Sequence, residues 1–219
     1  MELVLIDNSK VIHLTAVHRN DGQIYQPDFL QAIVTRYAFA KFPTLDELLK
    51  SEYHFAIGKF LEAQIQQFDI YGDGIIASSA SDTDVLAAFV DDVLSWVRES
   101  YGIVPIVIAN PERYFESSVV VRADVDLVRA IEPKGDMSSV IQRAFKQASA
   151  IEAAFQPTGF IFDTDAQTFP GRRKPLQFTI ERRLGVRYSD NVFYCRAPLP
   201  TKAHLAVLEA IEAFARLEG

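Results

Sequence analysis

The chain has 219 residues, 49% of them hydrophobic, and its 22 lysines and arginines against 29 aspartates and glutamates give a net charge of −7. This composition excludes a disordered chain, a collagen-like repeat and a disulfide-rich scaffold. The length predicts a single domain over residues 1–219. The lone cysteine, Cys195, indicates a reducing compartment, and no apolar run reaches the roughly 20 residues that span a bilayer. We therefore expect a cytoplasmic protein that does not contact membranes.

The N-terminal part reads mainly as strands. Residues 3–6 and 11–17 are rich in aliphatic and β-branched side chains, and the Asp-Asn-Ser sequence at 7–9 is typical of a turn between them. Residues 27–42 fit both helical spacing and strand alternation, and a helix is the first interpretation.

The middle of the chain carries the clearest local signals. Thr44 and Glu47 have the spacing of a capping box, in which each residue hydrogen-bonds the other's backbone amide at the start of a helix. The Gly-Asp-Gly sequence at 72–74 predicts a tight turn between strands at 65–71 and 75–78. A further strand is predicted at 53–61. These segments together predict an antiparallel meander.

A long amphipathic helix follows the meander. Polar side chains at residues 81–84 can satisfy its first amides, and Gly102 is placed to end it. The apolar positions share one face and are expected to be buried: Leu86, Phe89, Val90, Val93, Leu94, Val97 and Tyr101.

The second half repeats part of this pattern. Strands are predicted at 103–108, 114–125, 159–165, 176–183 and 192–195, and helices at 136–155 and from Thr201 onward. The apolar residues expected to face the core are Val140, Ile141, Phe145, Ala148, Ile151 and Phe155 in the first helix, and Leu205, Leu208, Ile211, Phe214 and Ala215 in the second. A hairpin and a capped helix occur at 65–101 and again at 176–217, so the chain has possible related halves at 1–110 and 111–219.

Strands outnumber helices and are joined mostly by turns. The sequence therefore predicts an α+β fold, with a mainly antiparallel sheet and three or four helices packed on it.

Two carboxylates at the end of a predicted strand are the strongest catalytic motif. The sequence at 160–165, Phe-Ile-Phe-Asp-Thr-Asp, resembles the first motif of the haloacid-dehalogenase-like phosphotransferases. That resemblance implies Asp163 as nucleophile and Asp165 as acid/base. The chain departs from the family pattern because Gln167 stands where Thr or Val is required. The 54 residues after Asp165 are also too few for the family's remaining strands, lysine and acidic pair. Membership of that family is therefore not predicted.

A divalent-metal-dependent nuclease or phosphohydrolase is the enzymatic alternative. Asp163, Asp165 and Glu181 fall on or beside neighbouring predicted strands, where carboxylates could hold Mg²⁺. Arg183 could stabilise negative charge there but could not act as a base. The four histidines lack the spacing of a helical zinc site, and the glycines form no phosphate-binding loop, so no cofactor is expected.

The charges are segregated along the chain. Residues 62–92 carry seven acidic residues and no lysine or arginine, whereas residues 170–196 carry seven basic residues and two acidic ones. Surfaces of opposite sign steer association between proteins. The candidate interaction residues are Arg172, Arg173, Lys174, Arg182, Arg183 and Arg187 on the basic side, and Asp82, Asp84, Asp91 and Asp92 on the acidic side.

These observations predict a non-catalytic structural or protein-interaction component that self-associates or binds another protein through its acidic and basic surfaces. Nucleic acid is an alternative partner, because the basic segment at 170–196 could contact phosphates.

Overall fold

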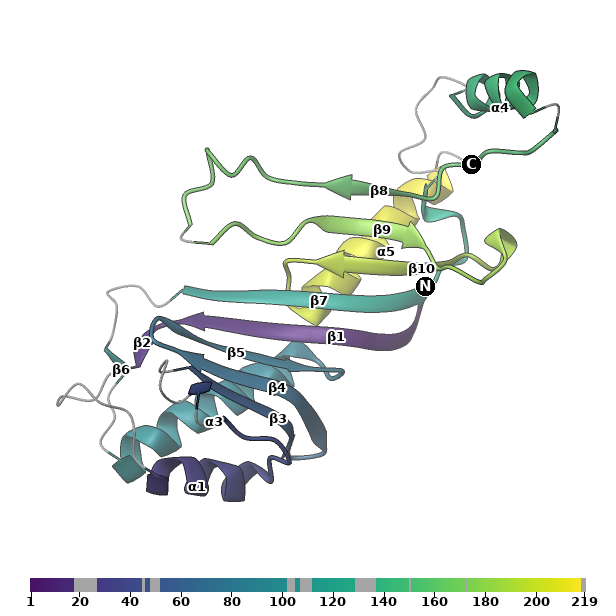
Figure 1. The fold of residues 1–219 in the computed structure, drawn as a ribbon. Coiled ribbons are helices and arrows are strands. Elements are labelled where there is room, and N and C mark those ends of the chain that lie inside the picture. Colours follow the sequence, from purple (N-terminus) through teal and green to yellow (C-terminus); the bar gives the residue numbers. More distant parts are fainter. Residues whose placement is uncertain are drawn as a thin grey trace. The chain divides into compact units, whose positions relative to one another are not determined.

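The computed structural model describes residues 1–17, 27–44, 46–47, 52–101, 105–106, 112–128, 137–149, 151–171 and 173–217, and Figure 1 labels their elements. In this part of the chain, one antiparallel sheet has eight strands in the order β3-β4-β5-β1-β7-β10-β9-β8. Its strands are β1 (Glu2–Leu14), β3 (Tyr53–Phe60), β4 (Ala63–Tyr71), β5 (Gly74–Ser79), β7 (Glu112–Arg122), β8 (Gly159–Phe162), β9 (Phe178–Arg182) and β10 (Val192–Ala197). A separate pair consists of β2 (Ala16–Val17) and β6 (Pro105–Ile106).

Four helices accompany the sheet among the described residues: α1 (Pro27–Tyr37), α3 (Thr83–Tyr101), α4 (Met137–Ser149) and α5 (Thr201–Leu217). The predicted α+β class is confirmed. None of these helices is both long enough and apolar enough to cross a membrane.

The chain divides into two compact units. Unit 1 consists of Met1–Leu5, Val119–Ala197 and Leu205–Gly219, and unit 2 of Ile6–Ser118 and Pro198–His204. The predicted halves at 1–110 and 111–219 stay a prediction, and the order of elements supports it. Apart from the two-residue strands β2 and β6, a strand, a helix, three strands and a helix (β1, α1, β3–β5, α3) are followed by the same series (β7, α4, β8–β10, α5).

Unit 2 has an aromatic core between its helices and strands. Phe29, Ile33 and Tyr37 of α1 pack in one buried cluster with Phe68 of β4 and Phe89 of α3. Figure 1 shows α1 and α3 on the same side of β3–β5. Of the seven predicted apolar residues of α3, Leu86, Phe89, Val90, Val93 and Val97 are buried, and Leu94 and Tyr101 are partly buried against the same cluster.

The first turns of α3 and α5 share their hydrogen bonds. The Thr201 amide donates to the Thr83 hydroxyl at 2.8 Å, and the Thr83 amide donates to the Thr201 hydroxyl at 3.2 Å. Both threonines belong to unit 2, and they are only 0% and 1% exposed. Asp82 adds a cap by accepting from the Asp84 amide. Free amides at a helix start need such partners. The predicted helix from Thr201 onward is present, and the Thr201 hydroxyl accepts from the first turn of α3.

Several local predictions hold within unit 2. The Thr44 amide donates to the Glu47 carboxylate at 2.7 Å, and the Glu47 amide points back at the Thr44 hydroxyl at 3.4 Å, which confirms the capping box. The hairpin of β4 and β5 is confirmed. The prediction of a turn at 7–9 is wrong. Strand β1 runs through these residues, and Ser9 pairs with Ser79 of β5. Pairing with a neighbouring strand outweighs the turn preference of these residues.

Two predictions about the helices of unit 1 are corrected by the structure. α4 is shorter than the predicted helix, and its apolar side chains are exposed instead of inward, with Val140 57% and Ile141 47% exposed. On α5, Leu208 and Ala215 are buried as predicted, but Phe214 is 61% exposed. Both errors have one cause: helical spacing identifies an apolar face but not the surface that covers it.

Candidate interaction site

Helix α4 presents a largely uncovered apolar face, on which the ring of Phe155 lies against that of Phe145 with the ring centres 5.3 Å apart. Val140, Ile141, Ala144, Phe145 and Ala148 are all exposed and follow helical spacing on one side, and we call them the α4 face. Its other side carries Gln142, Arg143, Lys146 and Gln147. An amphipathic helix of this kind is stable in water only when its apolar side is buried against something.

Helix α5 has a second uncovered apolar face. Val207, Ala210, Phe214 and Leu217 are exposed and follow the three- and four-residue spacing of a coiled-coil seam. We call these four residues the α5 stripe. Phe214 is 61% and Leu217 82% exposed. Large apolar groups gathered on one exposed helix face typically mark an interaction surface.

The first half of the chain shows what covers this kind of surface. Thr83 and Thr201, which begin α3 and α5, lie 118 residues apart, and Gly74 and Val192, which begin β5 and β10, have the same separation. At this offset of 118 residues, the sheet-facing positions of α3 correspond to those of α5. Leu86, Val90 and Val97 correspond to His204, Leu208 and Ala215, and all six residues are buried.

The same offset relates the α5 stripe to the surface of α3 that α1 covers. Val207 corresponds to Phe89, and Phe214 corresponds to Trp96. On α3 these positions lie under aromatic side chains of α1, with the Phe89 and Trp96 rings at 5.0 and 6.3 Å from the rings of Tyr37 and Phe29 respectively. In unit 1, the equivalent surface of α5 is exposed.

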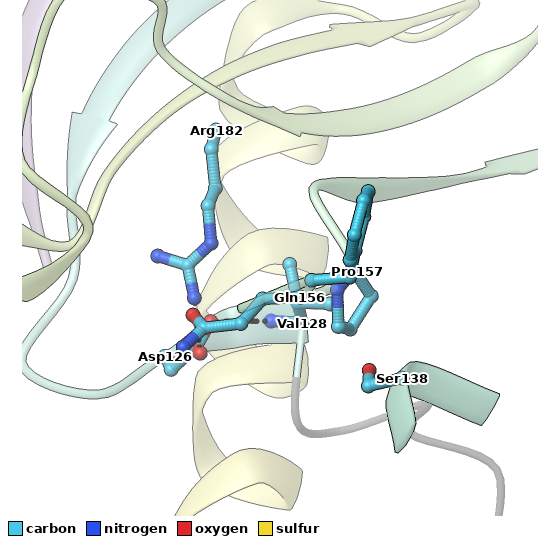
Figure 2. Close-up of a pocket in the computed structure, with 7 residues that line it drawn as sticks. Asp126, Val128, Ser138, Gln156, Pro157 and Arg182 are labelled. Atoms are coloured by element: carbon cyan, nitrogen blue, oxygen red, sulfur yellow. Dashed lines mark hydrogen bonds and ion pairs between the residues drawn. The ribbon is translucent and has the colours of Figure 1, made fainter. Parts of the chain in front are cut away.

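A pocket of about 250 Å³ lies between the two chain segments that flank α4. Asp126 and Val128 line it from the segment before the helix, and Gln156 and Pro157 from the segment after it. Figure 2 shows Arg182 of β9 reaching towards Asp126 from the strand side.

Arg182 acts as an anchor for the pocket. Its side chain is only 7% exposed, forms an ion pair with Asp126 and donates to the Tyr188 carbonyl at 3.1 Å. Its guanidinium lies 4.6 Å from the centre of the Tyr188 ring and 5.5 Å from that of Phe193. Such stacking favours a buried arginine. These contacts fix the segment before α4 to β9, and they leave Arg182 little exposed charge for a partner.

No protein-family model matches the chain, and no curated protein matches it at a significant level.

The predicted acidic residues are mostly paired within unit 2. Asp84 forms an ion pair with Lys202, Asp91 with Arg113 and Asp92 with Arg36, while Asp82 caps α3. Ion pairs already made within a chain add little to docking. Self-association through complementary charges stays a prediction, and these pairs reduce its support.

The predicted basic residues are spread over different settings. Lys174 pairs with Asp163 at 2.8 Å, and Arg182 pairs with Asp126. Arg173 and Arg187 are exposed, and Arg172 lies outside the described residues. Arg183 lines a shallow hollow of about 460 Å³ together with Arg122 and Asp190. Nucleic-acid binding through this segment stays a prediction.

The three carboxylates of the nuclease alternative are not brought together. Glu181 pairs in register with Gly159, and Asp163 lies four residues further along, roughly 13 Å at the rise of a strand. Asp163 accepts from Gln177 and Lys174, which lowers the pKa of its carboxyl to about 2. Asp165 accepts from the Gln167 amide in a local turn. The described residues contain no group of three or more metal-binding side chains.

Two histidines and the cysteine have defined structural settings. His204 is fully buried, with Nδ1 2.8 Å from the Ser117 hydroxyl, and burial lowers the pKa of its imidazole to about 4. His54 lies with Nδ1 2.9 Å from the buried carboxylate of Asp69, and this hydrogen bond raises the pKa of the histidine. Burial raises the pKa of the Cys195 thiol, which makes a nucleophilic thiolate unfavourable.

The α5 stripe was not predicted as a surface. Phe214 was expected to face the core, and Val207, Ala210 and Leu217 were not among the predicted interaction residues. These residues follow the three- and four-residue spacing of a coiled-coil seam, and they lie beside the positions of α5 that face the sheet. That spacing could have identified the stripe.

Proposed function

We propose that this protein is a non-catalytic interaction component that self-associates through the α5 stripe. The observation that supports this proposal is that one face of α5 is exposed, whereas the corresponding face of α3 is covered. The exposed residues are Val207, Ala210, Phe214 and Leu217. Burying such a face releases water from apolar area, which is the main favourable contribution to association.

A second copy of the chain is the partner that this surface fits. Three of the four positions flanking the stripe, Ala206, Ile211 and Ala213, are uncharged, and the fourth is Glu218 at its end. Along most of the stripe, two copies in contact would therefore bring no like charges together beside the seam. The same patch on both copies would form a two-fold contact, the commonest arrangement in homodimers.

The α5 stripe supports this proposal better than the charged segments do. Three of the four predicted acidic residues are already paired within unit 2. Apolar contacts are also retained at high salt, which screens exposed charges. We therefore expect self-association to persist, or to strengthen, as salt is raised.

The test is a concentration series in analytical ultracentrifugation with a matched pair of variants. Phe214→Glu places a charge in the stripe and should weaken self-association roughly tenfold or more, since tenfold corresponds to about 1.4 kcal/mol. Leu184→Glu is the control, because Leu184 is 95% exposed and lies off the stripe. It should leave self-association unchanged. Wild-type protein that stays monomeric at every concentration, or equal effects of the two variants, would overturn the proposal.

A further inference from the structure

We propose that α4 is an intrachain cover for the α5 stripe, and that its docking competes with self-association. This inference rests on the proposed function, because a cover has a regulatory role only if the stripe binds another copy. Its first support is the repeated order of elements. α4 occupies the place in the second series that α1 occupies in the first, between the leading strand and the three-stranded meander.

The contacts of α1 show how such a helix docks. Phe29, Ile33 and Tyr37 recur every four residues along α1 and are 0–3% exposed against the core of unit 2. The α4 face offers the same kind of pattern, with Val140, Ala144 and Ala148 spaced by four and Ile141 and Phe145 beside them. Both uncovered faces belong to unit 1, and each is the type of surface that the other would bury.

The polar contacts explain why the two helices would behave differently. Arg36 of α1 pairs with Asp92 of α3 at 3.0 Å, and the Tyr37 hydroxyl donates to the same carboxylate at 2.6 Å. The Arg36 guanidinium also lies 5.3 Å from the centre of the Trp96 ring. These contacts fasten α1 to α3 in a fixed register.

The second half lacks this fastening. The α5 residue that corresponds to Asp92 is Ala210, and the residue that corresponds to Trp96 is Phe214. Docking of α4 on α5 would therefore lack a counterpart of the ion pair and hydrogen bond that Asp92 makes with α1. Without the equivalent of these polar contacts, α4 would cover the α5 stripe reversibly.

The contacts that hold the chain beside α4 would let this helix move only over a limited range. Arg182 and Asp126 hold the chain just before Val128, and Pro157 lies close to the start of β8. The helix thus stays tethered near the pocket while it docks or releases.

The first experiment is cross-linking at protein concentrations too low for self-association. Cysteines replace Ala144 of the α4 face and Ala210 of the stripe, and a short bismaleimide joins them. Native Cys195 is fully buried and serves as the unreactive background. The control pair is Ala144→Cys with Glu209→Cys, on a different face of α5. We expect at least tenfold faster linkage of the first pair, within one chain, as identified by peptide mass spectrometry.

The second experiment releases the cover. The double variant Ile141→Glu, Phe145→Glu changes two exposed residues, so the fold should be kept, as circular dichroism would verify. We expect self-association to become about tenfold tighter in ultracentrifugation, because the stripe is no longer covered.

The outcomes separate the two proposals. Linkage between chains, or weaker self-association of the double variant, would mean that α4 is part of the contact between copies and would overturn the intrachain cover. Equal linkage of the test and control pairs would also overturn it, while self-association through the stripe would still be judged by Phe214→Glu. If Phe214→Glu has no effect on self-association, the proposed function fails, whatever the cross-linking shows.

Discussion

His204 should make the folded protein sensitive to mild acid. Its imidazole is fully buried beside Ser117, and burial lowers its pKa from an ordinary value of 6.5 to about 4. Between these two values the unfolded chain binds a proton at this position and the folded chain does not. The free energy of unfolding must therefore fall as the pH falls through this window.

The size of the effect follows from the two pKa values. At pH 5 this histidine is about 97% protonated in the unfolded chain and about 9% protonated in the folded chain, which corresponds to a loss of about 2 kcal/mol relative to pH 8. Leucine is the natural replacement, because the corresponding α3 residue, Leu86, is fully buried. His204→Leu removes this loss, although the Ser117 hydroxyl then loses its partner at every pH.

The assay is urea unfolding followed by the fluorescence of Trp96, the only tryptophan, at several values between pH 8 and pH 5. The difference between wild type and His204→Leu, and not either absolute value, is the quantity of interest. Other titrating groups are common to both proteins and cancel in that difference. We expect the difference to shift by about 2 kcal/mol in favour of the variant as the pH falls. Parallel pH profiles would refute the reasoning.

Three further predictions concern unit 2 and can be checked by the same unfolding assay. Leu61 is 70% exposed with a φ of 51°, so Leu61→Asn should raise the free energy of unfolding by about 1 kcal/mol, and a decrease would contradict the strained turn. A Cβ at Gly58 would lie 2.3 Å from the Phe39 ring, so Gly58→Ala should cost about 1–3 kcal/mol; an unchanged midpoint would show that the ring moves freely. The raised pKa of His54 means that its bond to Asp69 stabilises the fold below pH 6.5 and is lost as the pH rises. His54→Gln should therefore destabilise more at pH 5.5 than at pH 8.5, and the reverse order would refute this assignment.

Local signals in the sequence predicted much of unit 2. The capping box of Thr44 and Glu47, the hairpin turn at 72–74 and the buried face of α3 each depend on residues close together in the chain. Backbone preference and helical spacing are sufficient for such features. The β1 error shows their limit, because residues 7–9 prefer a turn in isolation but are held extended by pairing with β5.

The candidate site could be predicted only in part. The spacing of α4 and α5 revealed their apolar faces, but covered and uncovered faces have the same spacing. Phe214 and Trp96 occupy corresponding positions, and only the neighbouring helix distinguishes them. The distribution of charge along the sequence likewise does not show which charges are paired within the chain. Asp84, for instance, pairs with Lys202, a residue 118 positions away.

The exchanged hydroxyls of Thr83 and Thr201 have a consequence for biosynthesis. Residues 198–204 belong to unit 2, although most of that unit ends at Ser118. The opening turn of α3 in a nascent chain therefore lacks its partner until Thr201, 118 residues after Thr83, has been translated. Contacts between such distant residues slow folding. The larger unit would reach its final form only after nearly all of the smaller one had been synthesised.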